Sequence, residues 1–147
     1  MKISSPVFEH NTYIPSKYTC DGQNINPPLS IRDVPQASKS LVLIMDDPDA
    51  PMKTWLHWTV WNIDPAISEI AENSCPSDAV ECVTSFGRTG YGGPCPPSGT
   101  HRYFFKLFAL DTILDLKPGA VLKEIERSME NHVIEKAELI GLYKRSW

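Results

Sequence analysis

Proline is the residue type that most restricts the fold of this chain, because 13 of its 147 residues are proline. A proline inside a helix removes a backbone hydrogen bond and collides with the preceding turn, and within a sheet it is confined to edges and bulges. The prolines are spread from residue 6 to residue 118 without a repeat. This spacing disfavours a helical bundle and favours short strands that are joined by many loops.

Several segments between the prolines have the composition of strands. Residues 40–45 form an unbroken apolar run, which is typical of a strand that is buried on both faces. Four further segments are predicted as strands, at residues 57–63, 80–86, 103–110 and 138–143. Residues 46–51 (DDPDAP) contain two prolines and are predicted to be neither strand nor helix.

One amphipathic helix is predicted late in the chain, over about residues 119–132. Apolar residues recur there at spacings of three and four, with charged residues between them. No repeat or linker divides the sequence. The predicted architecture is therefore mainly β and antiparallel, in a single domain over residues 1–147, with one late helix.

Charge and hydropathy exclude several classes of function. The chain carries 14 Lys and Arg against 18 Asp and Glu, a net charge of −4 at pH 7, which disfavours nucleic acids and anionic membranes as partners. The first residues lack the apolar core of a signal peptide, and no apolar run is long enough to span a membrane. We therefore expect a cytoplasmic protein without a transmembrane segment, with reduced thiols at Cys20, Cys75, Cys82 and Cys95.

Two proline-rich segments each stand shortly before a histidine. The segment DPDAP at residues 47–51 precedes His57, and the segment GPCPP at residues 93–97 precedes His101. If the chain is extended from residue 101 onward, His101 and Tyr103 point to the same face and place an imidazole beside a phenol.

These residue types predict a site for an oxyanion. The rings of His101 and Tyr103, with the backbone N–H groups of Gly92 and Gly93, could bind an anion without a lysine. A nearby carboxylate such as Asp47 favours a ligand that also carries an ammonium group. A phosphorylated amino alcohol satisfies both requirements.

The same residues have simpler interpretations. A strand histidine is often hydrogen-bonded in the core, and Asp47 and Asp49 can cap turns, with Arg102 pairing with one of these carboxylates. A hydrolase is the weakest alternative, because Ser98 lacks a nucleophile-elbow motif and Cys95 between prolines is a poor site for a thiolate. We expect no catalytic residue, metal or cofactor.

At the two segments the sequence resembles the phosphatidylethanolamine-binding protein family, also called the Raf kinase inhibitor-like family, in its short bacterial and archaeal branch. The resemblance rests on DPDAP at 47–51, HW at 57–58, GPCPP at 93–97 and HRY at 101–103, and weaker similarity covers nearly the whole chain. It implies a large antiparallel sheet packed on a smaller one, with both segments framing a small pocket.

By position, the resemblance assigns ligand binding to Asp47, His57, Gly93, His101 and Tyr103. It assigns the pocket wall and its support to Pro48, Asp49, Pro51, Trp58 and Pro94. The family often has a cis proline in the first segment, for which Pro48 and Pro51 are the candidates.

The resemblance implies a binding protein for phosphate, a phosphorylated lipid head group or another small organic anion, with a regulatory role as a further implication. The alternative is an inhibitor of a protein kinase or a serine peptidase that acts through a protein–protein surface.

Overall fold

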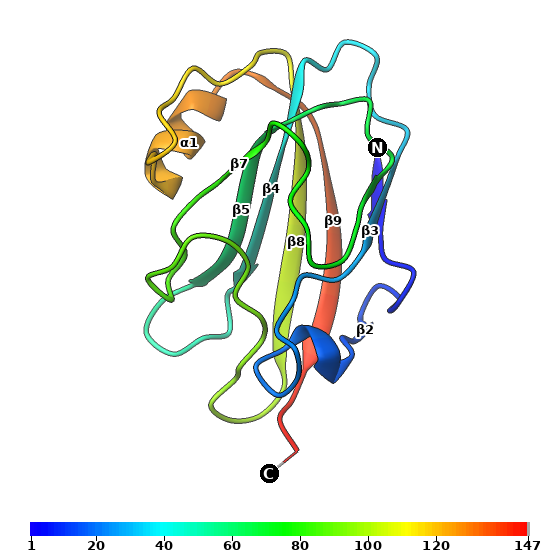
Figure 1. The fold of residues 1–147 in the computed structure, drawn as a ribbon, viewed down its shortest axis with the longest axis vertical. Coiled ribbons are helices and arrows are strands. Elements are labelled where there is room, and N and C mark those ends of the chain that lie inside the picture. The colour runs from blue at the N-terminus through cyan, green and yellow to red at the C-terminus, as the bar shows by residue number, and fades with distance from the viewer. Residues whose placement is uncertain (147) are drawn as a thin grey trace.

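The structure is a computed structural model that describes residues 1–146 (Figure 1). Its strands form a six-stranded sheet in the order β2-β9-β8-β4-β5-β7 and a three-stranded sheet in the order β1-β3-β6. Among the described residues the strand pairs are antiparallel, apart from the short parallel pair of β2 with β9. The bounds are β1 Lys2–Ser4, β2 Thr12–Tyr13, β3 Leu29–Arg32, β4 Ser40–Asp47, β5 Trp55–Ile63, β6 Glu69–Ile70, β7 Val80–Glu81, β8 His101–Leu110 and β9 Val133–Tyr143.

The central strand β4 is buried on both faces, as its apolar run predicts. Leu41, Leu43 and Met45 face a core that the large sheet shares with the small sheet. Val42 and Ile44 face a second core on the opposite side of the large sheet. This alternation gives the molecule three layers and confirms the predicted packing of a large sheet on a smaller one.

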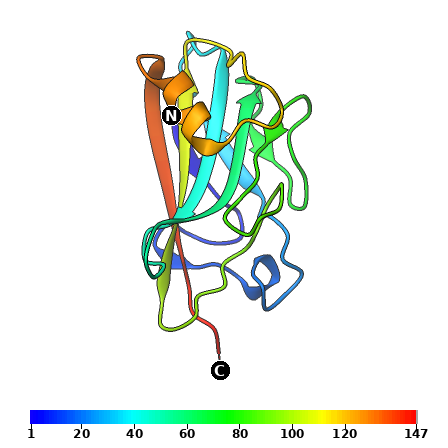
Figure 2. The same ribbon diagram turned by 90° about the vertical axis from the view of Figure 1, so that its left-hand side faces the viewer.

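The α-helix of the described residues, α1, covers the second core from Leu122 to Met129 (Figure 2). It contributes Ile125 and Met129 to that core, together with Leu110 from β8. The helix is shorter than the predicted 119–132, because the backbone of Val121 is extended and the chain leaves helical geometry at Glu130. Among residues 1–146, no helix combines the length and apolar character that crossing a membrane requires.

Several strand boundaries differ from the sequence prediction, and β5, β8 and β9 each begin earlier than predicted, at Trp55, His101 and Val133. Strand β4 continues through Asp46 and Asp47, where a loop is expected, because both carboxylates find cationic or imidazole partners in Lys106 and His101. Strand β7 contains only Val80–Glu81 of the predicted 80–86. A register shift between β4 and β5, where Met45 pairs with Trp58 and Asp46 with Leu56, also interrupts the large sheet near this end.

Candidate functional site

A cavity of about 300 Å³ lies at one end of the large sheet, where β4 ends and β8 begins. Two loops border it. We call residues 48–54, between β4 and β5, the first loop, and residues 87–100, before β8, the second loop. The lining consists of Asp47, Ala50, Pro51, Trp55, His57, Phe86, Cys95, Pro96, Pro97, His101 and Tyr103. The structure thus brings four of the five predicted ligand-binding residues together, and Gly93 is the exception.

The charged part of the cavity is a buried carboxylate–imidazole pair. His101 Nδ1 lies 2.6 Å from Asp47 Oδ2, and both side chains are almost fully buried. The other carboxylate oxygen of Asp47 accepts the backbone N–H of Asp49 at 2.8 Å. Both oxygens of Asp47 are therefore engaged, and the contact of Oδ2 with Nδ1 fixes the orientation of the His101 ring.

Tyr103 lies between the two imidazoles of the cavity. Its ring centroid is 5.1 Å from that of His57 and 6.5 Å from that of His101. The phenol is fully buried, and its hydroxyl has no hydrogen-bond partner among residues 1–146. Burial, with the nearby charge of Asp47, raises the pKa of Tyr103 far above its usual value, against a smaller lowering effect of the Cys95 backbone. That backbone group lies near the hydroxyl but does not meet the distance and angle of a hydrogen bond. The hydroxyl is therefore protonated at neutral pH and can donate a hydrogen bond to a ligand.

His57 reaches the cavity because of a β-bulge. Met45 pairs with Trp58 and Asp46 with Leu56, so His57 is the extra residue of β5 without a partner on β4. Its Nδ1 lies 2.6 Å from the carbonyl oxygen of Gly92. A carbonyl only accepts hydrogen bonds, so Nδ1 carries the hydrogen.

The protonation state of His57 follows from its burial. Burial lowers the pKa of His57 below its usual 6.5, against the raising effect of the Gly92 carbonyl and the Asp47 charge. The ring is therefore neutral at pH 7, and its Nε2 is a hydrogen-bond acceptor. The cavity thus offers a donor at Tyr103 and an acceptor at His57.

Aromatic residues that no motif indicated form one wall of the cavity. Phe86 lies edge-on to Trp55 at 5.6 Å and to His57 at 5.2 Å. The ring of Phe86 rests on the backbone of Gly92, where a Cβ atom would lie 2.4 Å from it. Phe86 belongs to no motif. Only its position just before the glycine-rich segment could have indicated that it lines the cavity.

The Gly92 and Gly93 amides, which were predicted to bind the anion, are hydrogen-bonded within the protein. The Gly92 N–H donates to the carbonyl of His57 at 2.9 Å, and the Gly93 N–H donates to Asn24 Oδ1 at 2.8 Å. Gly93 does not line the cavity, and a Cβ atom there would lie 2.4 Å from the carbonyl oxygen of Tyr18. Both glycines position the second loop, because their N–H groups are already bonded within the protein.

The residues predicted for the pocket wall divide into two groups. Pro51 lines the cavity, whereas Pro48, Asp49, Trp58 and Pro94 do not. The Nε1–H of Trp58 donates to a carboxylate oxygen of Glu81 at 2.7 Å, on the core side of β5. Trp58 faces the core in phase with Val60, whereas the bulge brings His57 and Trp55 to the cavity.

Asp49 supports the first loop from outside the cavity. It accepts the backbone N–H, Nε–H and Nη2–H of Arg102 at 2.9, 2.9 and 2.8 Å. This guanidinium lowers the pKa of Asp49 to about 2. The ion pair expected for Arg102 is therefore with Asp49, and it joins the first loop to β8.

The expected cis proline is absent from the described residues, in which every peptide bond is trans. The first loop turns instead at Met52, which has a left-handed φ of 74°. The N–H of Lys53 donates to the carbonyl of Pro51 at 3.0 Å across this turn. A γ-turn at Met52 thus provides the reversal that Pro48 and Pro51 were expected to provide by a cis bond.

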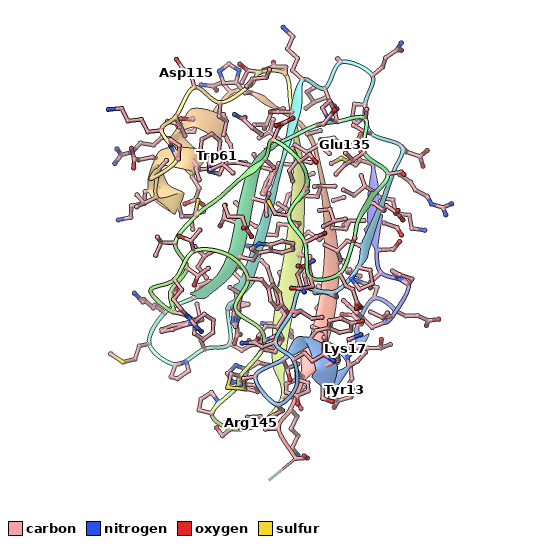
Figure 3. The ribbon with its side chains drawn as sticks, in the orientation of Figure 1. Tyr13, Lys17, Trp61, Asp115, Glu135 and Arg145 are labelled. Atoms are coloured by element: carbon pink, nitrogen blue, oxygen red, sulfur yellow. A yellow bond between two sulfur atoms is a disulfide. The ribbon has the colours of Figure 1, made fainter. Side chains whose placement is uncertain are left out.

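The expectation of reduced cysteines is wrong for one pair. Cys20 and Cys95 form a disulfide between segments 75 residues apart in sequence, and their Cα atoms lie 5.4 Å apart. Figure 3 shows this bond at the same end of the molecule as Arg145. Cys75 and Cys82 have free thiols. Sequence spacing could not indicate the pair, because only the fold brings the second loop against the segment after Tyr18.

Comparisons with known proteins agree with this geometry. The profile of the phosphatidylethanolamine-binding protein family matches residues 4–144. The chain is 51% identical to a protein of Methanothermobacter thermautotrophicus named UPF0098 protein, over 99% of both chains. A structure described as a phosphatidylethanolamine-binding protein homolog from Chlamydia trachomatis matches with a TM-score of 0.95 and 41% identity, over 99% of this chain and 97% of the other. E. coli YbcL, described as a new member of the mammalian PEBP family, matches with a TM-score of 0.91 and 28% identity, over 99% and 98% of the two chains.

Proposed function

This chain belongs to the phosphatidylethanolamine-binding protein family, and from that premise we propose that its cavity binds a small phosphorylated head group. The observation that carries the proposal is the hydroxyl of Tyr103, which is buried in the cavity without a hydrogen-bond partner among residues 1–146. An unpartnered buried hydroxyl costs about 1–3 kcal/mol, and an acceptor on a ligand removes that cost.

The acceptor groups of the cavity favour a ligand that carries a positive charge as well as a negative one. The Asp47 carboxylate repels a bare anion, and neutral His57 presents a lone pair at Nε2. An ammonium group satisfies both, while a phosphate oxygen accepts the hydrogen of Tyr103. Phosphorylethanolamine fits this pattern better than inorganic phosphate does, and a cavity of about 300 Å³ suits a ligand of this size.

We propose binding rather than turnover as the activity of this site. The Cys95 sulfur is bonded to Cys20, so it offers no thiolate, and Ser98 does not line the cavity. The alternative of an inhibitor that acts on a kinase or a peptidase stays a prediction. If the site binds its ligand without turnover, the protein should not hydrolyse chromogenic phosphate esters or carboxylic esters.

An NMR titration with phosphorylethanolamine, and separately with inorganic phosphate, tests the proposal. The four histidines provide internal controls, because His57 and His101 are buried in the cavity while His10 and His132 are exposed. We expect saturable shifts of the His57 and His101 ring signals, and none at His10 and His132 beyond those in sodium chloride of equal ionic strength. Equal shifts at all four rings, or none up to millimolar ligand, would contradict the proposal.

The variant Tyr103→Phe removes the proposed donor and keeps the ring. We expect an affinity about tenfold weaker, as befits the loss of one hydrogen bond to a charged group, and no loss of stability, because the hydroxyl has no protein partner. Tyr91→Phe is the matched control. The Tyr91 hydroxyl donates to the carbonyl of Tyr18 at 2.7 Å outside the cavity, so this variant should lose stability and retain affinity.

A further inference from the structure

The wall of the cavity is covalently tied to another part of the chain. Cys95 lines the cavity, and its sulfur is bonded to Cys20, which follows the short 3-10 helix η1, Ser16–Tyr18. Figures 1 and 3 place η1 and the disulfide at the end of the molecule where Arg145 lies. One covalent bond therefore links the wall of the proposed binding site to the segment after η1.

Among residues 1–146, the disulfide is the last covalent bond or hydrogen bond that joins the second loop to another segment before β8 begins. Up to Pro94 the loop is held by hydrogen bonds, including that from the backbone N–H of Cys20 to the carbonyl of Pro94 at 3.1 Å. From Pro96 to Thr100, no hydrogen bond joins the loop to any other part of residues 1–146. Pro96 and Pro97, which complete the wall, have no N–H group to donate.

We infer that reduction of the Cys20–Cys95 disulfide weakens ligand binding, so that the bond is a redox control of the cavity; the inference rests on the proposed function. With the bond intact, the positions of Pro96 and Pro97 are restricted by a link to the folded body of the protein. Without it, residues 95–100 regain conformational freedom, and ordering them again upon binding costs free energy. The affinity of the reduced protein is therefore lower.

The chemistry requires an external dithiol. One thiolate of the dithiol attacks a sulfur of the disulfide to form a mixed disulfide, and its second thiol then displaces the protein sulfur. The protein gains two electrons and two protons and carries two thiols, while the dithiol becomes a disulfide. Cys20 and Cys95 are only half-buried, which leaves the bond open to attack.

The two free cysteines of the chain do not compete in this exchange. Burial raises the pKa of the Cys75 thiol to about 11 and that of the Cys82 thiol to about 11. Both are therefore almost entirely protonated at neutral pH, and thiols attack disulfides only as thiolates. The Cys20–Cys95 bond is thus exchanged by external thiols and not by rearrangement within the chain.

Calorimetric titration with phosphorylethanolamine tests the inference on the oxidised protein, the protein reduced with dithiothreitol, and the variant Cys20→Ser. This variant breaks the bond and leaves the cavity residue Cys95 unsubstituted. We expect the reduced protein and Cys20→Ser to bind about tenfold more weakly than the oxidised protein. Cys75→Ser, which alters a free thiol outside the cavity, should bind as the oxidised protein does and respond to reduction in the same way.

The failures of the two proposals are distinguishable. If the oxidised and reduced proteins bind equally, the disulfide is a structural link only and the inference is overturned while the proposed function stands. If neither binds, the proposed function is contradicted and the redox control is overturned with it. Circular dichroism of the reduced protein and of Cys20→Ser verifies that both remain folded, so that weaker binding reports on the loop.

A second measurement does not depend on the titration. Because coupling is reciprocal, the ligand must stabilise the disulfide by the same factor by which oxidation strengthens binding. A tenfold coupling makes the reduction potential about 30 mV more negative at saturating ligand. An unchanged equilibrium in mixtures of oxidised and reduced dithiothreitol, with and without phosphorylethanolamine, would overturn the inference.

Discussion

The first loop and the second loop border the same cavity but are fixed by different interactions. The first loop is held by carboxylates: Asp47 accepts the N–H of Asp49, and Asp49 accepts three hydrogen bonds from Arg102. The second loop is held by buried backbone and by a covalent bond, through Gly93, Pro94 and Cys95. Its anchoring residues carry no charge.

This difference determines which conditions disturb each side of the cavity. Hydrogen bonds to a carboxylate weaken when the carboxylate is protonated, so the first loop is sensitive to acid. Close packing of backbone and a disulfide do not depend on pH in the acidic range, so the second loop responds to steric changes and to reductants. A ligand held between the two loops is therefore exposed to two independent influences.

The largest effect is expected from a methyl group at the point where the second loop packs on the segment after η1. In Gly93→Ala, the Cβ atom would lie 2.4 Å from both Asn24 Oδ1 and the carbonyl oxygen of Tyr18, and 2.9 Å from the Cα atom of Thr19. Backbone cannot move aside as a flexible side chain does. We expect the free energy of unfolding, measured by urea denaturation, to fall by about 3 kcal/mol.

Gly119→Ala is the matched control, because nothing lies within 4 Å of the corresponding Cβ position. It should leave stability unchanged or raise it by about 0.5 kcal/mol, since alanine restricts the unfolded chain. Equal urea midpoints for the two variants would show that the second loop is not fixed by this close approach.

The next effect concerns the acid sensitivity of the first loop. Arg102 lowers the pKa of Asp49 to about 2 from an unfolded value near 3.8. A depressed carboxyl pKa stabilises the folded state above the unfolded pKa, and this contribution is lost as the pH falls through the folded pKa. Because the Arg102 side chain is 53% exposed, we expect Asp49→Asn to remove only about 1 kcal/mol at pH 7.

The pH dependence of the free energy of unfolding distinguishes the first loop from the second loop. The stability difference between the natural chain and Asp49→Asn should vanish as the pH falls from about 4 to about 2, whereas the deficit of Gly93→Ala should persist. Asp115→Asn, at an exposed carboxylate at the far end of the molecule (Figure 3), is the control and should show neither effect. A deficit of Asp49→Asn that is constant across this range would remove the electrostatic account of the first loop.

The two loops also differ in how far the sequence predicted them. The long strands β4, β5, β8 and β9 and the late helix follow from local patterns, because burial on one or both faces leaves a period of two or an unbroken apolar run, as in β4 and β8. The short strands of the small sheet carry no such pattern and were not predicted individually. The alternation of β8 likewise placed His101 and Tyr103 on one face. The motifs at 47–51 and 93–97 indicated the location of the cavity through resemblance to a known family.

What the sequence could not supply depends on contacts between distant segments. The bulge at His57 changes which residues of β5 face the cavity, and it brings Trp55 into the wall. The Cys20–Cys95 bond joins segments 75 residues apart, and neither flanking segment carries a signal for it. The amides of Gly92 and Gly93 looked available because their partners, His57 and Asn24, are known only from the fold.

The smallest effect contrasts one residue with a positive φ from each loop, Met52 and Gly99. Met52 is fully exposed at φ 74°, whereas the second loop uses Gly99 at φ 67° in open space. This conformation destabilises a residue with a Cβ atom by about 1 kcal/mol, and it does not destabilise glycine. Met52→Gly should therefore raise the free energy of unfolding by about 0.5 kcal/mol, after the greater entropy of the unfolded chain is included, and Gly99→Ala should lower it by a similar amount. Thermal unfolding of both variants measures the two signs, and a loss of stability in Met52→Gly would mean that the exposed methionine side chain stabilises the first loop by contacts that outweigh its backbone strain.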